Sequence, residues 1–215
     1  MKNEVGFVVK ARPYPPEHIF LMDTPDFVPA PELWRWIKAN FLNPESQLFN
    51  PDHSHLGLFH YPQIAVMWAR AGYKKQGRNV AGTAEKIMIN ASGWKKERQE
   101  EQLYQWFNDL PDYLITIDAT YAQQANDIDF CALIEHELYH IAHKKDQYGI
   151  PSYNRETGKP NLAIQGHDVE EFTGVVRRYG ANKEVQQMID AAKQRPEVSR
   201  ADIYNACGTC FLRVV

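Results

Sequence analysis

The sequence predicts a single α+β domain, in which a small, mostly antiparallel sheet packs against one helix and a helical C-terminal lobe follows. Segments 64–70, 80–90 and 113–119 are typical of strands, and the last of them alternates apolar residues on one face. Segment 128–145 instead repeats apolar residues at helical spacing, without a Pro or Gly. The 215 residues suit one domain with one hydrophobic core.

The composition is that of an ordinary globular protein. Hydrophobic residues make up 44% and charged residues 24%, and the net charge of −3 lacks the basic excess of nonspecific nucleic-acid binders. No apolar run approaches the roughly 20 residues that span a bilayer, and the N-terminal run is too short for a secretory signal. Three cysteines, an odd number, argue against a disulfide framework. We therefore expect a cytoplasmic protein without membrane or evident nucleic-acid partners, of open oligomeric state.

The first part of the chain alternates predicted elements with Pro-rich loops. Segment 5–11 is typical of a short strand, and segment 31–41 of a helix that begins at Pro31. Segment 43–63 is irregular and contains the His53-x-His55 pair, for which a surface loop is the expected setting and a second metal site the alternative.

The middle of the chain predicts a hairpin, a helix and a strand. Strands 64–70 and 80–90 flank a turn-rich connection, which favours a β-hairpin. Segment 94–110 has an apolar helical stripe that Pro111 ends. We expect unpaired backbone groups of strand 113–119 to bind an extended peptide by strand addition.

The most specific motif is H-E-x-x-H at residues 136–140, inside the predicted helix 128–145. Residues four apart lie on one helix face, so His136 and His140 can reach one metal ion. Glu137 is offset around the helix and can act as a base on an attacking water. Two ligands, one base and one open position are the pattern of a zinc hydrolase.

A catalytic zinc site usually takes a third protein ligand. His143 lies seven residues beyond His136, a rise of about 10.5 Å along a helix, which is too far. His167 is the preferred candidate because it precedes a predicted helix with a cap at Asp168, and Gly166 allows a close approach. Glu170 and Glu171 are the alternative third ligands. If they do not bind the metal, they could orient the imidazole of a ligand by a hydrogen bond.

The C-terminal lobe is predicted to be helical. Asn182 begins a helix with the apolar stripe Val185, Met188, Ile189 and Ala192. The single C-x-x-C pair Cys207 and Cys210 lacks the second pair of a structural zinc site, so buried or tail thiols are expected. Residues 1–215 are thus one domain, with a metal-binding core at about 113–180 and a helical extension at about 181–215.

The sequences H-E-L-Y-H, G-H-D-V-E-E-F at 166–172 and R-R-Y-G at 177–180 resemble the putative phage metallopeptidase family. The resemblance covers mainly residues 113–180, and more loosely 64–90. That family is similar in turn to SprT-like and Spartan-like zincins, in which a Gly-His pair before a Phe-bearing helix supplies the third zinc ligand. The resemblance implies a zincin fold, a phage or prophage origin and His167 as that ligand. Phe172 lies one residue further from the His than is typical in those zincins.

These observations together predict a zinc-dependent metallopeptidase that acts on proteins or peptides. His136, His140 and His167 are the predicted metal ligands, and Glu137 is the predicted catalytic base. The candidates for stabilising the oxyanion are Tyr139, Tyr153, Arg177 and Tyr179. The alternatives are an SprT-like protease acting on DNA-bound proteins, and a non-catalytic phage factor that binds a host protein and uses zinc as a structural staple.

Overall fold

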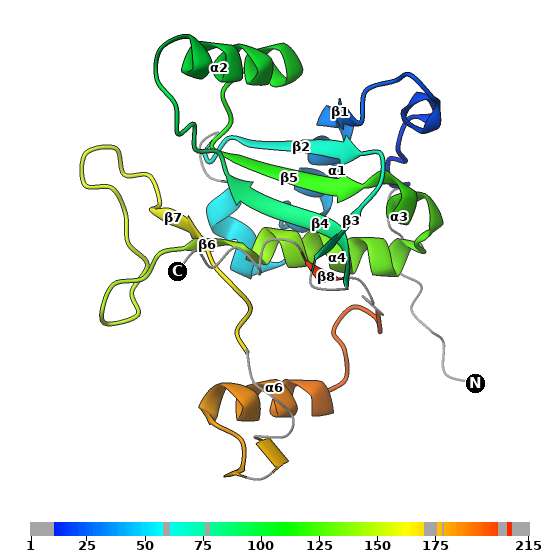
Figure 1. The fold of residues 1–215 in the computed structure, drawn as a ribbon. Coiled ribbons are helices and arrows are strands. Elements are labelled where there is room, and N and C mark those ends of the chain that lie inside the picture. The colour runs from blue at the N-terminus through cyan, green and yellow to red at the C-terminus, as the bar shows by residue number, and fades with distance from the viewer. Residues whose placement is uncertain are drawn as a thin grey trace.

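The computed structural model describes residues 11–57, 61–75, 78–169, 176–177, 179–201 and 206–207, and it has the predicted α+β class (Figure 1). The strands are β1 (Phe27–Pro29), β2 (Ile64–Ala69), β3 (Tyr73–Lys75), β4 (Arg78–Lys86), β5 (Tyr113–Asp118), β6 (Ile141–His143), β7 (Leu162–Ile164) and β8 (Ala206–Cys207). The α-helices are α1 (Pro31–Phe41), α2 (Gly93–Phe107), α3 (Ala119–Gln124), α4 (Asp127–Tyr139) and α6 (Lys183–Lys193). Two 3-10 helices are η1 (Glu17–Phe20) and η2 (Pro51–Leu56).

The main sheet is mixed and has the strand order β1-β2-β5-β4-β3, with β8 also paired to β4. β2–β5 and β4–β8 are parallel, whereas β1–β2, β3–β4 and β4–β5 are antiparallel. The predicted hairpin between segments 64–70 and 80–90 is wrong, because β5 lies between β2 and β4. The actual hairpin is β3–β4. Since β5 has a neighbour on each side, the expectation that it binds a peptide by strand addition is also wrong.

The main hydrophobic core lies between one face of this sheet and helices α1 and α4. Alternate residues of β2 and β5 point into it, among them Trp68 and Tyr113, which are fully buried. The predicted helix 31–41 is confirmed as α1, and its Leu33 and Ile37 face this core. The core therefore holds α4 against the sheet, with Phe130 packed beside Trp68.

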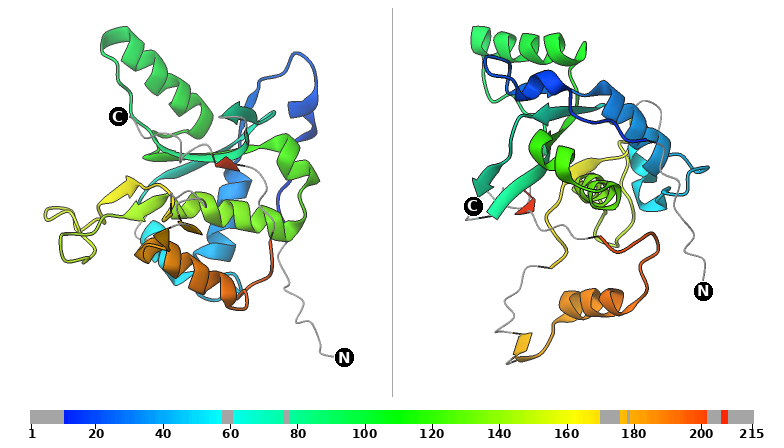
Figure 2. Two further views of the ribbon diagram at one scale, coloured as in Figure 1. Left: turned by 60° about the horizontal axis from the view of Figure 1, so that its bottom comes forward. Right: turned by 90° about the vertical axis from the view of Figure 1, so that its right-hand side faces the viewer.

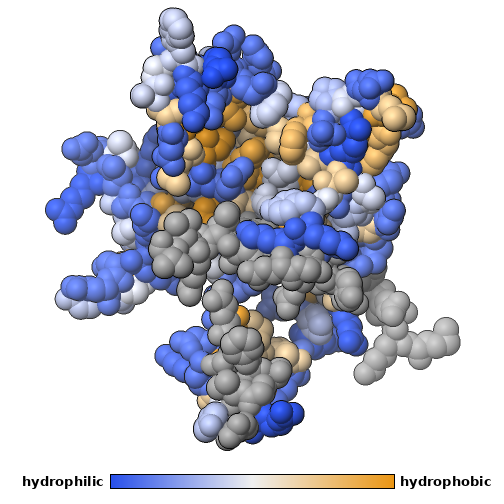
Figure 3. Space-filling view, in the orientation of Figure 1, coloured by the Kyte–Doolittle hydropathy of each residue, from blue (hydrophilic) through white to orange (hydrophobic). Residues whose placement is uncertain are grey.

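Helix α2 covers part of the opposite face and stands away from the body of the protein (Figure 2). Trp106 and Phe107 at its end pack on Ala65, Met67 and Leu114 of the sheet, and Figure 3 shows hydrophobic residues between this helix and the sheet. The helix ends earlier than predicted, at Phe107, because Asn108 adopts a left-handed conformation with φ 54° ahead of Pro111.

The C-terminal helix α6 is confirmed and begins after Asn182, whose side chain accepts a hydrogen bond from the Val185 amide. It lies apart from the sheet, on the side where α4 runs (Figures 1 and 2). Residues 5–10 of the predicted N-terminal strand lie outside the described residues. Within the described part of the chain, no helix combines the length and apolar character that crossing a bilayer requires.

Candidate metal centre

Helix α4 carries the H-E-x-x-H motif beneath the sheet. It begins at Asp127 and is capped by Asn126, whose side chain accepts a hydrogen bond from the Asp129 amide at 2.9 Å. The helix ends at Tyr139 rather than near residue 145. The following residues form β6 and pair with β7, which returns the chain to the end of the helix.

The two histidines of the motif converge at this end of α4. Nε2 of His140 lies 3.2 Å from Nε2 of His136. Nδ1 of His140 lies 2.7 Å from the carbonyl oxygen of Gln165, an acceptor, so Nδ1 carries the proton and Nε2 presents a lone pair. The Gln165 amide in turn donates to the His140 carbonyl, and its side chain donates to the Tyr139 carbonyl.

The loop after β7 adds His167 to this pair. Its Nε2 lies 3.0 Å from Nε2 of His136, and the ligand atoms of the three histidines all lie within 4.8 Å of one another. Two nitrogens on a tetrahedral zinc with bonds of about 2.0–2.1 Å are separated by about 3.3 Å. The two distances that His136 makes are close to this value, so the three imidazoles could hold one ion. No other group of His, Cys, Asp or Glu in the described chain has this arrangement.

The protonation state of His136 also suits a ligand. Burial, with a smaller contribution from the neighbouring His140 and His167, lowers the pKa of His136 to about 4. The imidazole is therefore neutral near pH 7, which is the form that binds a metal.

Glu137 is fully buried and faces β4. A Cβ atom added to Gly82 of β4 would lie only 2.7 Å from Oε1 of Glu137. The carboxylate thus occupies the space that a side chain would otherwise fill, and Gly82 is required by this close approach. β8 pairs with β4 at the same point, where Cys207 is opposite Gly82.

Residues 50–55 form a second support of α4 that the sequence did not predict. Asn50 donates to Oε1 of Glu135 at 2.7 Å and to the hydroxyl of Tyr139 at 2.9 Å, and that hydroxyl donates to Asp52 at 2.9 Å. Burial raises the pKa of Tyr139 to about 12. This hydroxyl is therefore already held by Asn50 and Asp52.

The expected surface position of the His-x-His pair is wrong for His53. Its side chain is fully buried, with its ring 4.5 Å from that of Tyr139 and Nε2 3.6 Å from Glu135. Nε2 of His55 lies 2.7 Å from the Ile141 carbonyl oxygen. Both histidines therefore contact the segment that contains the metal-centre residues, and neither belongs to the histidine cluster.

The other candidate side chains are not among the described residues that line the cavity of the histidine cluster. His143 is in β6 with Nε2 2.8 Å from the Ser152 carbonyl oxygen, and Tyr153 packs on its ring. Arg177 and Tyr179 are both exposed.

Among the described residues, a Cβ atom added to Gly166 would meet no atom within 4 Å, so no packing contact there requires a glycine. Two acidic candidates and a cysteine lie outside the described residues: Glu170, Glu171 and Cys210.

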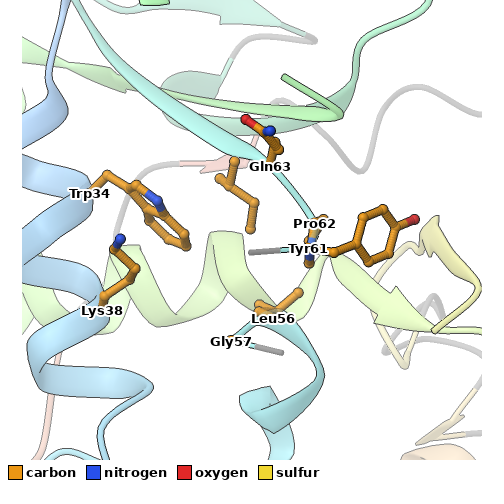
Figure 4. A pocket seen from close by; sticks show the side chains of 8 residues that line it. Trp34, Lys38, Leu56, Gly57, Tyr61, Pro62 and Gln63 are labelled. Carbon is orange, nitrogen blue, oxygen red and sulfur yellow. The ribbon is translucent and has the colours of Figure 1, made fainter. Parts of the chain in front are cut away.

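The histidine cluster opens into a cavity of about 410 Å³. Its described lining consists of His136, Tyr139, His140, Gln165, Gly166, His167, Asp168, Val169 and Met188. A larger cavity of about 680 Å³ lies between α1 and residues 56–57 and 61–64, and its lining includes Trp34, Lys38, Tyr61 and Gln63 (Figure 4). None of the three clustered histidines lines that second cavity, so the candidate metal site lies at the smaller one.

Comparison with known proteins identifies a family for this chain but no individual relative. No curated protein and no solved structure matches the chain. Residues 34–193 match a family model described as "Putative phage metallopeptidase". The match covers about three quarters of the chain and includes most of α1, strands β2 to β7, α4 and all three histidines. The chain therefore belongs to the putative phage metallopeptidase family.

Proposed function

We propose that this protein is a zinc-dependent metallopeptidase with a zincin-like active site that hydrolyses peptide bonds. The observation that carries the proposal is the convergence of three imidazole Nε2 atoms, with neighbours 3.0 and 3.2 Å apart, at the end of a helix that also carries a buried glutamate. Membership of a peptidase family implies a protein substrate.

The donor set fits zinc. Imidazole nitrogens suit this ion, and three protein ligands with one open position are the pattern of catalytic rather than structural zinc sites. In this proposal His136, His140 and His167 hold the ion, and the Gln165 carbonyl orients His140. A zinc ion held there supplies Lewis-acid polarisation of the scissile carbonyl and of the attacking water.

Glu137 is the proposed general base. Its carboxylate takes a proton from the attacking water and delivers it to the leaving amine. The packing of α4 against β4 and the missing side chain at Gly82 fix the position of this carboxylate. A structural staple would leave a buried carboxylate beside the ligands without a chemical task. It would also normally be closed by a fourth protein ligand, which the cluster of three described here does not contain.

The test compares two histidine variants of the purified protein. His167→Ala removes a proposed ligand, whereas His143→Ala removes a histidine outside the cluster and serves as the matched control. We expect the wild type and His143→Ala to bind about one zinc per chain and to cleave an unfolded protein substrate in a zinc-dependent way. His167→Ala should lose both the zinc and the cleavage. Full zinc occupancy in His167→Ala would contradict the ligand set.

A further inference from the structure

The apolar stripe of α6 is only partly buried. Such a stripe normally packs against a core. Here Val185 is buried, but Met188, on the same face one turn further along, is 50% exposed. Met188 also lines the cavity of the histidine cluster. The exposed part of the stripe therefore faces the space where the substrate of the proposed reaction has to lie.

The described lining of this cavity is largely apolar apart from the three histidines, Gln165 and Asp168. Tyr139, Val169 and Met188 contribute apolar surface to it, and the side-chain amide of Gln165 donates a hydrogen bond to the Tyr139 carbonyl. Asp168 is the single charged side chain among the described lining residues other than the histidines. An acidic ligand would meet this carboxylate, whereas an aliphatic or aromatic group would bury apolar surface.

We infer that this cavity is a specificity subsite that binds a large aliphatic or aromatic side chain next to the scissile bond, with Met188 as the selecting residue. The inference rests on the proposed metallopeptidase function. A methionine suits this task because its unbranched, polarizable side chain adapts to apolar groups of different shape. A cavity of about 410 Å³ is large enough for a leucine or phenylalanine side chain.

The test measures binding rather than turnover. Amino-acid hydroxamates carry one metal-binding group and one side chain, and they are titrated into the zinc-loaded full chain by calorimetry. Leucine hydroxamate should bind about tenfold or more tightly than alanine hydroxamate, and aspartate hydroxamate should bind most weakly. Met188→Ala should remove most of the preference for leucine over alanine.

A charge variant and its control sharpen the result. Met188→Lys should weaken leucine hydroxamate and strengthen aspartate hydroxamate, whereas Gln187→Lys places the same charge on the neighbouring, exposed position outside the cavity lining and should change neither. Zinc-dependent binding with equal affinities for leucine and alanine, or unchanged by Met188→Ala, would overturn the subsite and leave the proposed function standing. Absence of zinc-dependent binding by any hydroxamate would overturn both.

Discussion

The substitution Gly82→Ala tests the contact between β4 and the proposed catalytic base. The new Cβ would lie 2.7 Å from Oε1 and 3.1 Å from both Cγ and Cδ of Glu137. Ordinary contacts of a Cβ begin near 3.4 Å, so the two groups must separate by about 0.7 Å. Glu137 is fully buried, and its helix packs on β4. Because the backbones of β4 and α4 are held by this packing, we expect the Glu137 side chain to be the part that moves.

The structure sets the expected size of two effects. Overpacking of a buried contact costs about 1–3 kcal/mol of unfolding free energy. A displacement of a catalytic group approaching 1 Å lowers turnover by about 10²-fold. Zinc content should stay near one per chain, because the three atoms nearest the new methyl group all belong to Glu137 and none to a proposed ligand.

The assay measures zinc content, urea denaturation and peptide hydrolysis on the same preparation. Gly57→Ala is the matched control, since its new Cβ would lie 3.8 Å from Cβ of Leu42, an ordinary contact, and Gly57 is not among the described residues that line the cavity of the histidine cluster; all three properties should stay unchanged. A zinc-loaded Gly82→Ala protein with wild-type turnover would refute the reasoning that Glu137 is held in its catalytic position by this contact.

Three further predictions concern the surroundings of α4. Arg12→Ala removes hydrogen bonds to Asp127 and to two backbone carbonyls, so urea denaturation should show a loss of about 2–4 kcal/mol; an unchanged midpoint would contradict this. Tyr139→Phe should cost about 1 kcal/mol and change turnover less than about tenfold, because its hydroxyl is held by Asp52 and Asn50; a larger fall in kcat would place it on the reacting carbonyl. Burial raises the pKa of Cys131 to about 12, so iodoacetamide at pH 8 should label it only in the unfolded chain, as read by mass spectrometry.

The sequence predicted the elements whose signals are local. Pro31 opens α1, Asn182 caps α6, and both helices begin where expected. Strand 113–119 is confirmed as β5 because its alternating residues face one core. The H-E-x-x-H motif likewise determines by helical spacing alone that His136 and His140 converge, which the structure confirms.

Features that depend on distant parts of the chain were not predictable in this way. The end of α4 is set by pairing of β6 with β7, and no Gly or Pro marks it in the sequence. The central position of β5 follows from its parallel pairing with β2, which is separated from it by β3, β4 and α2. The central position of β5 was predictable in part, because strands that are buried on both faces are rich in apolar residues.

The support of α4 by residues 50–55 was also missed. The His-x-His pair suggested a loop, but its role follows from Glu135 and Tyr139, which lie one helical turn apart and far away in sequence. Their spacing by four residues places both on one helix face, so they can share a partner, but nothing in the sequence shows which residue that is. The partner itself, Asn50, is identified by the tertiary structure.

The most direct test of the central proposal is Glu137→Gln, which keeps the shape of the side chain and removes its basic carboxylate. Zinc content, thermal stability and peptide hydrolysis are measured together on the wild type and this variant. The proposed mechanism predicts about one zinc per chain, an unchanged fold and hydrolysis lower by about 10²–10⁴-fold, the contribution of positioned proton transfer. A zinc-loaded Glu137→Gln protein that cleaves peptides at the wild-type rate would contradict it.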